Sequence, residues 1–121
     1  MVDNLESLTI VSTLFVIIGL LLRYLTPGIN RFYGYRTKTS MANQANWDFS
    51  QKYSGGLLAI FGIALLLIAL IIKYAEINIA NHTGKMTVGI LIVGSLISTI
   101  VLTEKAMKKH CKLNEEETTG R

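Results

Sequence analysis

Three long apolar runs constrain the fold of this chain of 121 residues more than any other feature. They cover about residues 6–25, 53–73 and 86–103, and charged side chains occur only at their ends. An α-helix needs about 20 apolar residues to cross a hydrocarbon core of about 30 Å. A soluble domain of this size would show short amphipathic periods instead. The sequence therefore predicts an all-α integral membrane protein with three transmembrane helices.

The domain organisation expected from these runs is simple. Residues 1–112 should form a single three-helix transmembrane module without an internal repeat. The polar end of the chain, residues 113–121, is predicted to be a disordered tail. Residues 1–7 contain Asp3 and Glu6 but no basic residue, which argues against a secretory signal peptide, so we expect the N-terminus to be retained.

Basic residues gather on one side of the predicted spans. Five of them lie between residues 23 and 52, and five more lie between residues 105 and 121. The opposite side holds only Lys73 and Lys85. The positive-inside rule then places the N-terminus outside, and residues 26–52 and the C-terminus in the cytoplasm. A net charge of +4 could suggest nucleic acid in a soluble protein, but charges that flank apolar spans suit the headgroups of membrane lipids better.

The segment 26–52, between the first two runs, is the longest stretch that is not apolar. It contains Trp47, the only tryptophan of the chain. Pro27 and Gly28 should end the first helix. Ser40 is a plausible N-cap for a short interfacial helix over residues 41–52.

Four residues recur every four positions across this segment and should share one helical face: Asn43, Trp47, Gln51 and Gly55. A polar stripe with a tryptophan is unusual for a surface that faces lipid. We therefore expect the stripe to pack against protein, such as the turn at residues 34–37.

The order and spacing of ten residues resemble the signature of the SdpI family of small bacterial integral membrane proteins. They are Asn30, Gly34, Tyr35, Arg36, Thr37, Ser40, Asn43, Trp47, Gln51 and Gly55. With the flanking apolar runs, the resemblance covers about two thirds of the chain. It implies a multi-pass protein of the bacterial cytoplasmic membrane. It also implies immunity to a secreted peptide toxin. The founding member in addition relays the presence of the toxin to a transcriptional repressor, but that member has extra spans that this chain lacks.

Arg36 is the first candidate for a binding role. Gly34 can adopt a backbone angle denied to other residues and would aim Arg36 into a polar pocket under the helix of residues 41–52. There the guanidinium could bind a phosphate or a carboxylate, including Asp48. The alternative is that Arg36 is an ordinary positive-inside anchor and that Asp48 simply faces water.

Trp47 could recognise a ligand or a toxin, or it could be an interfacial anchor. Asn30, Asn43 and Gln51 could bind a ligand, although such amides more often cap turns or tie helices together.

Catalysis, metal binding and proton relay have little support in the sequence. The main metal-ligand types, His82, His110 and Cys111, fall on opposite sides of the predicted membrane and lack zinc-like spacing. The sequence has no recognisable nucleophile–base set or Gly-rich phosphate loop. The apolar interiors of the spans contain no ionisable residue that could carry a proton. We therefore expect no enzyme activity, no cofactor and no metal.

The favoured function is SdpI-like immunity or toxin resistance, achieved by binding the toxin or shielding its target. The runner-up is a small oligomeric transporter or lipid-handling protein, with Arg36 and Trp47 contacting headgroups. A membrane enzyme is the third alternative. The expected partners are membrane lipids, a secreted peptide toxin and further copies of the chain, and no nucleic acid is expected.

Overall fold

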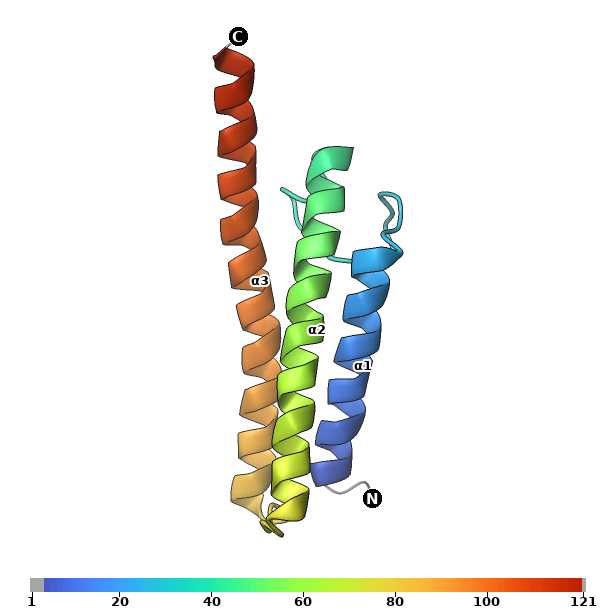
Figure 1. Ribbon diagram of the computed structural model, residues 1–121, viewed down its shortest axis with the longest axis vertical. Coiled ribbons are helices and arrows are strands. Elements are labelled where there is room, and N and C mark those ends of the chain that lie inside the picture. Colours follow the sequence, from blue (N-terminus) through green and yellow to red (C-terminus); the bar gives the residue numbers. More distant parts are fainter. Residues whose placement is uncertain (1–3, 121) are drawn as a thin grey trace.

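The computed structural model describes residues 4–120, which form three long α-helices (Figure 1). Helix α1 spans Asn4–Tyr24, α2 spans Gln44–Tyr74 and α3 spans His82–Thr119. By length and composition, each of the three is long and apolar enough to cross a membrane. No strand occurs within the described range, so the predicted all-α architecture with three apolar helices is confirmed.

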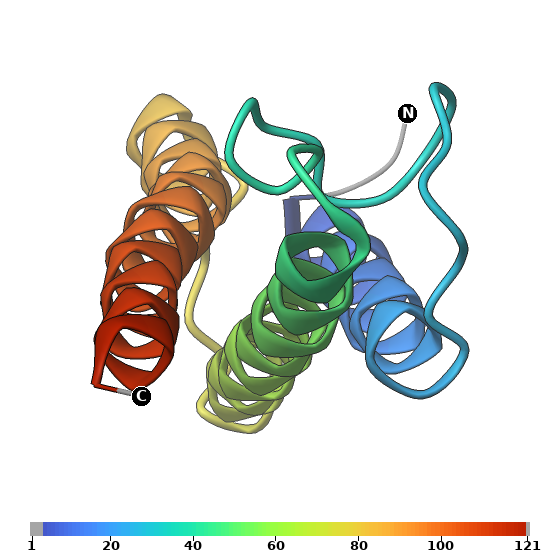
Figure 2. The ribbon, with the colours of Figure 1, turned by 90° about the horizontal axis from the view of Figure 1, so that it is seen from above.

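Helix α2 packs against both of the other helices, whereas α1 and α3 contact each other much less. Figure 2 shows α2 between α1 and α3 when the molecule is seen from above. The connecting loop, residues 25–43, leaves the end of α1, crosses toward α3 and returns to the start of α2. This loop therefore covers the gap between α1 and α3 at one end of the molecule.

Small residues bring the backbones of α1 and α2 into direct contact. A Cβ atom added to Gly19 would lie 2.5 Å from both the Gly55 carbonyl oxygen and the Ala59 nitrogen, closer than real Cβ atoms approach. A Cβ on Gly55 would lie 2.6 Å from the Gly19 carbonyl oxygen. Such close approach of small residues is a common way for helices to pack in a lipid environment, where burial of apolar area drives association less.

The interfacial helix predicted for residues 41–52 is not a separate element. Helix α2 begins at Gln44 and runs without a break into the apolar run that ends at Tyr74. Its N-cap is Asn43, whose side-chain oxygen accepts from the Asn46 nitrogen at 2.8 Å, so Ser40 is not the cap. The glycine pair that begins at Gly55 does not break the helix, and Gly55 packs directly against α1.

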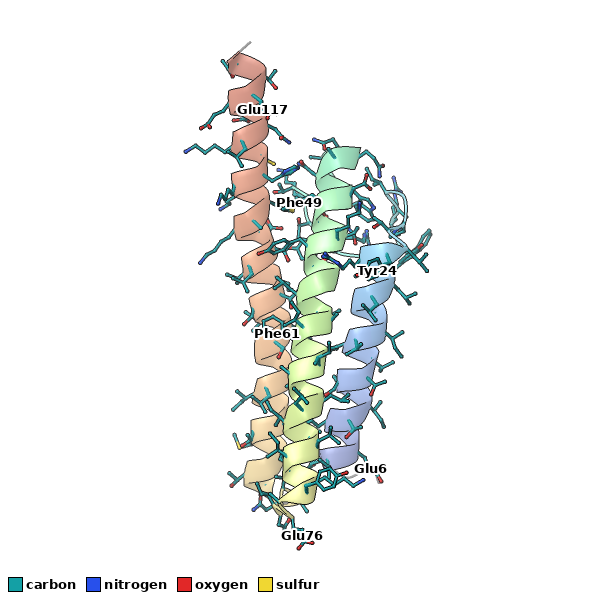
Figure 3. All side chains as sticks on the ribbon, in the orientation of Figure 1. Glu6, Tyr24, Phe49, Phe61, Glu76 and Glu117 are labelled. Atoms are coloured by element: carbon teal, nitrogen blue, oxygen red, sulfur yellow. The ribbon has the colours of Figure 1, made fainter. Side chains whose placement is uncertain are left out.

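The segment expected to be a disordered tail continues α3 as far as Thr119. Figures 1 and 3 show this part of α3, which carries Glu117, projecting beyond the start of α2. Its Leu and Glu residues have high helix propensity, which favours continuation of the helix. Asp3 and Arg121, which entered the signal-peptide and topology predictions, lie outside the described residues.

Candidate functional site

Gln51 fastens the connecting loop to α2. The Tyr35 backbone nitrogen donates to Gln51 Oε1 at 2.7 Å, and Gln51 Nε2 donates to the Tyr35 carbonyl oxygen at 2.7 Å. The Gln51 side chain is fully buried, so neither bond competes with solvent. A carboxamide is suited to this role because it carries one acceptor and two donors side by side.

Gly34 sits at the point where the loop meets α2, and no other residue type fits there easily. Its φ is +103°, a left-handed conformation that side chains rarely adopt. A Cβ at this position would also lie 2.8 Å from Gln51 Oε1 and 3.5 Å from Trp47 Cη2. The predicted special backbone angle of Gly34 is confirmed, and it serves to bring the loop backbone onto Gln51.

Trp47, one helical turn before Gln51 on α2, fixes the beginning of the loop. Its indole nitrogen donates to the Pro27 carbonyl oxygen at 2.6 Å, and the side chain is 0% exposed. The prediction that the stripe packs on protein is confirmed for Trp47, Gln51 and Gly55, all of which are buried. Asn43 is exposed and acts as the helix cap. Because the indole has no exposed surface here, a headgroup or ligand cannot contact Trp47 without a rearrangement.

Asn30, Thr37 and Ser40 shape the loop itself. The Asn30 side-chain oxygen accepts from the backbone nitrogens of the residues two and three positions later, both at 2.9 Å. The Thr37 nitrogen donates to Ser40 Oγ at 2.7 Å, and the Ser40 nitrogen donates to Thr37 Oγ1 at 3.2 Å. These reciprocal bonds are the turn-forming role that short polar side chains commonly play.

Tyr35 ties the loop to α3. Its hydroxyl donates to Glu104 Oε1 at 2.8 Å and lies 3.3 Å from the Ile100 carbonyl oxygen. Burial raises the pKa of the Tyr35 phenol above its ordinary value, and the hydrogen bond and negative charge of Glu104 raise it further. The phenol therefore remains a neutral donor over the physiological range.

Arg36 does not occupy the polar pocket that was expected for it. Its side chain is exposed, while the Asp48 carboxylate accepts from Gln44 Nε2 on its own helix at 2.8 Å. The reason lies in the turn at Gly34, which directs the hydroxyl of Tyr35 toward α3. The residue that points inward is therefore Tyr35, and not Arg36 as the sequence had suggested.

An apolar cavity of about 510 Å³ lies between the three helices, directly beneath the connecting loop. Gly34 and Tyr35 contribute to its roof, and its wall includes the α3 residues Leu96 and Ile100. The hydroxyls of Ser54 and Thr99 also line it, but both bond to carbonyl oxygens within their own helices at 3.4 and 2.9 Å. The remaining wall is supplied by Ile18, Leu21, Leu22, Leu25, Pro27, Tyr33 and Leu58. The cavity is therefore suited to an apolar occupant.

The comparisons with known proteins bear on this loop and cavity. A family model described as the SdpI/YfhL protein family matches residues 27–103. The chain belongs to the SdpI/YfhL family. It is also 31% identical over 96 residues to "Uncharacterized protein YfhL" of Bacillus subtilis (strain 168). The aligned region covers 78% of this chain and 80% of that protein. No solved structure matches it.

All ten residues that suggested the SdpI/YfhL family lie inside the matched range, and the structure shows how most of them are used. They fold the loop and hold it on α2, while Arg36 is exposed. Glu104 and the cavity wall were missed by the sequence analysis. Glu104 is an isolated acid at the start of a basic stretch, which was the available signal for a specific partner.

No group of three metal-binding side chains comes together within residues 4–120. The His110 ring stacks on Phe49 at a centroid distance of 4.3 Å, and Cys111 Sγ lies 3.6 Å from Asn46 Oδ1. Both residues thus take part in the contact between α3 and the start of α2.

Proposed function

We propose that this chain is an SdpI-like membrane immunity protein that confers toxin resistance by binding the toxin or shielding its target. Membership of the SdpI/YfhL family supports the proposal. The observation that carries it is the apolar cavity, whose roof is formed by signature residues Gly34 and Tyr35. A peptide that acts on membranes needs an apolar segment, and this cavity offers such a segment a complementary surface.

The proposed mechanism is a binding event without covalent chemistry. The hydrogen bonds of Gln51 keep the loop over the cavity, and the bond from Tyr35 to Glu104 keeps α3 at a fixed distance from the loop. The walls are therefore preorganised, which lowers the entropy cost of binding. Capture of the toxin's apolar segment would keep it from its target in the bilayer.

The protein would act as a multi-pass protein of the cytoplasmic membrane, with the N-terminus outside. The connecting loop and the end of α3 lie at the same end of the molecule, and the turn between α2 and α3 lies at the other end (Figure 1). The basic residues are concentrated at the loop end, while Lys73 and Lys85 flank the turn. The positive-inside rule favours a cytoplasmic position for the loop end.

A survival assay tests this function. Toxin-sensitive cells should survive secreted peptide toxins better with the chain than without it, and a panel of such toxins should reveal the cognate one. Leu21→Trp would place a bulkier side chain in the cavity wall and should weaken protection. Leu20→Trp is the matched control, since the two leucines are 44% and 48% exposed and only Leu21 lines the cavity. Equal protection by both variants would disprove the role of the cavity, and failure of the wild type against every toxin would contradict immunity.

A small oligomeric transporter or lipid-handling protein is the second candidate. It is favoured by Gly89 and Gly94 on α3, where an added Cβ would meet no atom within 4 Å. These glycines do not serve packing within one copy, and small residues permit close approach of another helix. This alternative predicts an oligomer in detergent and substrate flux in vesicles, neither of which immunity requires.

A further inference from the structure

A second hollow, the α2–α3 groove, lies between the start of α2 and the later part of α3. Its volume is about 480 Å³, and it shares no lining residue with the apolar cavity. The residues that matter for its chemistry are Phe49 and Tyr53 on α2 and Leu102, Lys105, Lys109 and His110 on α3. The groove therefore combines aromatic and apolar surface with two ammonium groups.

Stacked rings form one side of the groove. The Phe49 ring lies 4.3 Å from the His110 ring, with 7° between their planes, and 5.7 Å from the Tyr53 ring, with 20° between their planes. Figure 3 shows the Phe49 side chain in the space between α2 and α3. The stack joins the two helices, so the groove has a wall whose shape is defined by packing rather than by mobile side chains.

The position of the groove along the helices is also informative. Tyr53 stands at the start of the apolar run of α2, and Leu102 stands near the end of the apolar run of α3. Lys105 and Lys109 follow on α3, one helical turn apart, and both line the groove. Tyr53 and Leu102 thus lie toward the apolar runs, and the two ammonium groups lie beyond them, beside Phe49, His110 and Leu113. In the orientation proposed above, the lysines follow directly on the apolar spans, where headgroups are expected.

We propose that the α2–α3 groove binds one anionic phospholipid of the cytoplasmic leaflet. Its phosphate lies between Lys105 and Lys109, and the upper part of an acyl chain lies along Tyr53 and Leu102. Charge complementarity selects this occupant, because ammonium groups at a membrane face attract anionic lipid. The proposal rests on the membrane orientation given above, but it does not depend on toxin binding.

The structure offers an internal control for general electrostatic attraction. Lys108 and Lys112 belong to the same stretch of α3 and are exposed, but they do not line the groove. The double variants Lys105→Gln/Lys109→Gln and Lys108→Gln/Lys112→Gln change the net charge equally. A built site responds only to the first pair, whereas a diffuse positive surface responds to both.

The test is native mass spectrometry of the purified full-length protein, titrated with phosphatidylglycerol or with phosphatidylcholine. The wild type should prefer phosphatidylglycerol, and Lys105→Gln/Lys109→Gln should lose about tenfold in affinity for it. Lys108→Gln/Lys112→Gln should stay within about twofold of wild type. Soluble glycerol phosphate should not compete, because it lacks the acyl chain. Equal losses in both double variants, no lipid preference in the wild type, or full competition by glycerol phosphate would each overturn the proposal.

A labelling experiment on the wild type covers the case in which a variant fails to fold. Phosphatidylglycerol with a photoreactive group near the glycerol end of its acyl chain should label Tyr53 or Leu102. Labelling spread evenly over the outer faces of α1 and α3 would contradict a site. Because no toxin is present in either experiment, failure here leaves the survival assay unaffected, and failure of immunity leaves the lipid measurement valid.

Discussion

Gln51 pairs with Tyr35 through both backbone polar groups of the tyrosine, with two hydrogen bonds of 2.7 Å. The Gln51 side chain thus satisfies the backbone N–H and C=O of Tyr35, sixteen positions earlier, in the way that the backbone of a paired β-strand would. The arrangement leaves the Tyr35 side chain pointing to α3, where its hydroxyl reaches Glu104. One buried carboxamide therefore organises the contact among the loop, α2 and α3.

Gln51→Glu should destabilise the protein, because an ionised carboxylate keeps the acceptor for the Tyr35 nitrogen but has no donor for the Tyr35 carbonyl, and protonating it to restore a donor costs free energy at neutral pH. The carboxyl group would also be fully buried, as Gln51 is. We expect a loss of about 1–3 kcal/mol in the free energy of unfolding. Unfolding in detergent, followed by circular dichroism, measures the loss. Lys52→Gln is the control at an exposed neighbour, and an unchanged stability of Gln51→Glu would show that the two bonds contribute nothing.

Gly34→Ala should be costly for two reasons that act together. The methyl group would have to adopt a φ of +103° and would lie 2.8 Å from Gln51 Oε1. We expect a loss of at least about 1–3 kcal/mol in stability. Gly28→Ala is the matched control, since a Cβ there meets nothing within 4 Å. If the two variants melt at the same temperature, the constraint at Gly34 is absent in solution.

The two ends of α2 show what sequence can predict and what it cannot. The apolar run to Tyr74 was predictable, because a span of about 20 apolar residues has few alternatives. The stripe containing Trp47 and Gln51 was predictable from helical periodicity. The continuity of α2 through Gly55 was not, because a glycine pair can either end a helix or pack inside one, and the contact of Gly55 with Gly19 is remote in sequence.

The candidate site also has features that the sequence predicted and features that it did not. The importance of the loop followed from its residue types, but the choice between Tyr35 and Arg36 as the inward residue depends on the turn at Gly34. Residue types alone do not give the direction of that turn. The cavity depends on the relative placement of three helices, and no local pattern encodes it.

Gly55→Ala and Gly94→Ala should have opposite effects. In Gly55→Ala, the new methyl would lie 2.6 Å from the Gly19 carbonyl oxygen, so α1 and α2 would have to separate. We expect a loss of about 1–3 kcal/mol from overpacking. In Gly94→Ala, the methyl meets no atom of the chain, and the better helix propensity of alanine should raise stability by up to about 1 kcal/mol. Thermal unfolding in detergent compares them, and a destabilised Gly94→Ala would instead indicate a packed partner helix.

Arg36→Lys should leave stability within about 0.5 kcal/mol of wild type, because the guanidinium is exposed. Arg36→Gln should behave in the same way. The measurement is again thermal unfolding, with Trp47→Ala as a reference variant that should lose about 3–5 kcal/mol because the indole is fully buried. A large loss in both Arg36→Lys and Arg36→Gln would show that the fork of the guanidinium binds a group in solution.

Tyr35→Phe should loosen α3 while leaving the loop in place on α2. The substitution removes the hydroxyl that donates to Glu104, but it keeps the backbone groups that pair with Gln51. Cys111, the only cysteine, lies two turns beyond Glu104 and contacts Asn46 on α2, so its reaction with a thiol reagent reports the contact between the two helices. We expect faster labelling of Cys111 in Tyr35→Phe and in Glu104→Gln, and no additional increase in the double variant, since both remove one interaction.

The same hydroxyl predicts a pH dependence at the alkaline end. The pKa of the Tyr35 phenol is raised in the folded protein, so the unfolded chain ionises first as the pH increases. The folded state then binds more protons than the unfolded state, and the contribution of Tyr35 to stability is complete below about pH 10 and declines above it. The difference in unfolding free energy between wild type and Tyr35→Phe should therefore shrink above about pH 10. A difference that stays constant across that range would show that burial and Glu104 do not raise the pKa of the phenol in the folded protein.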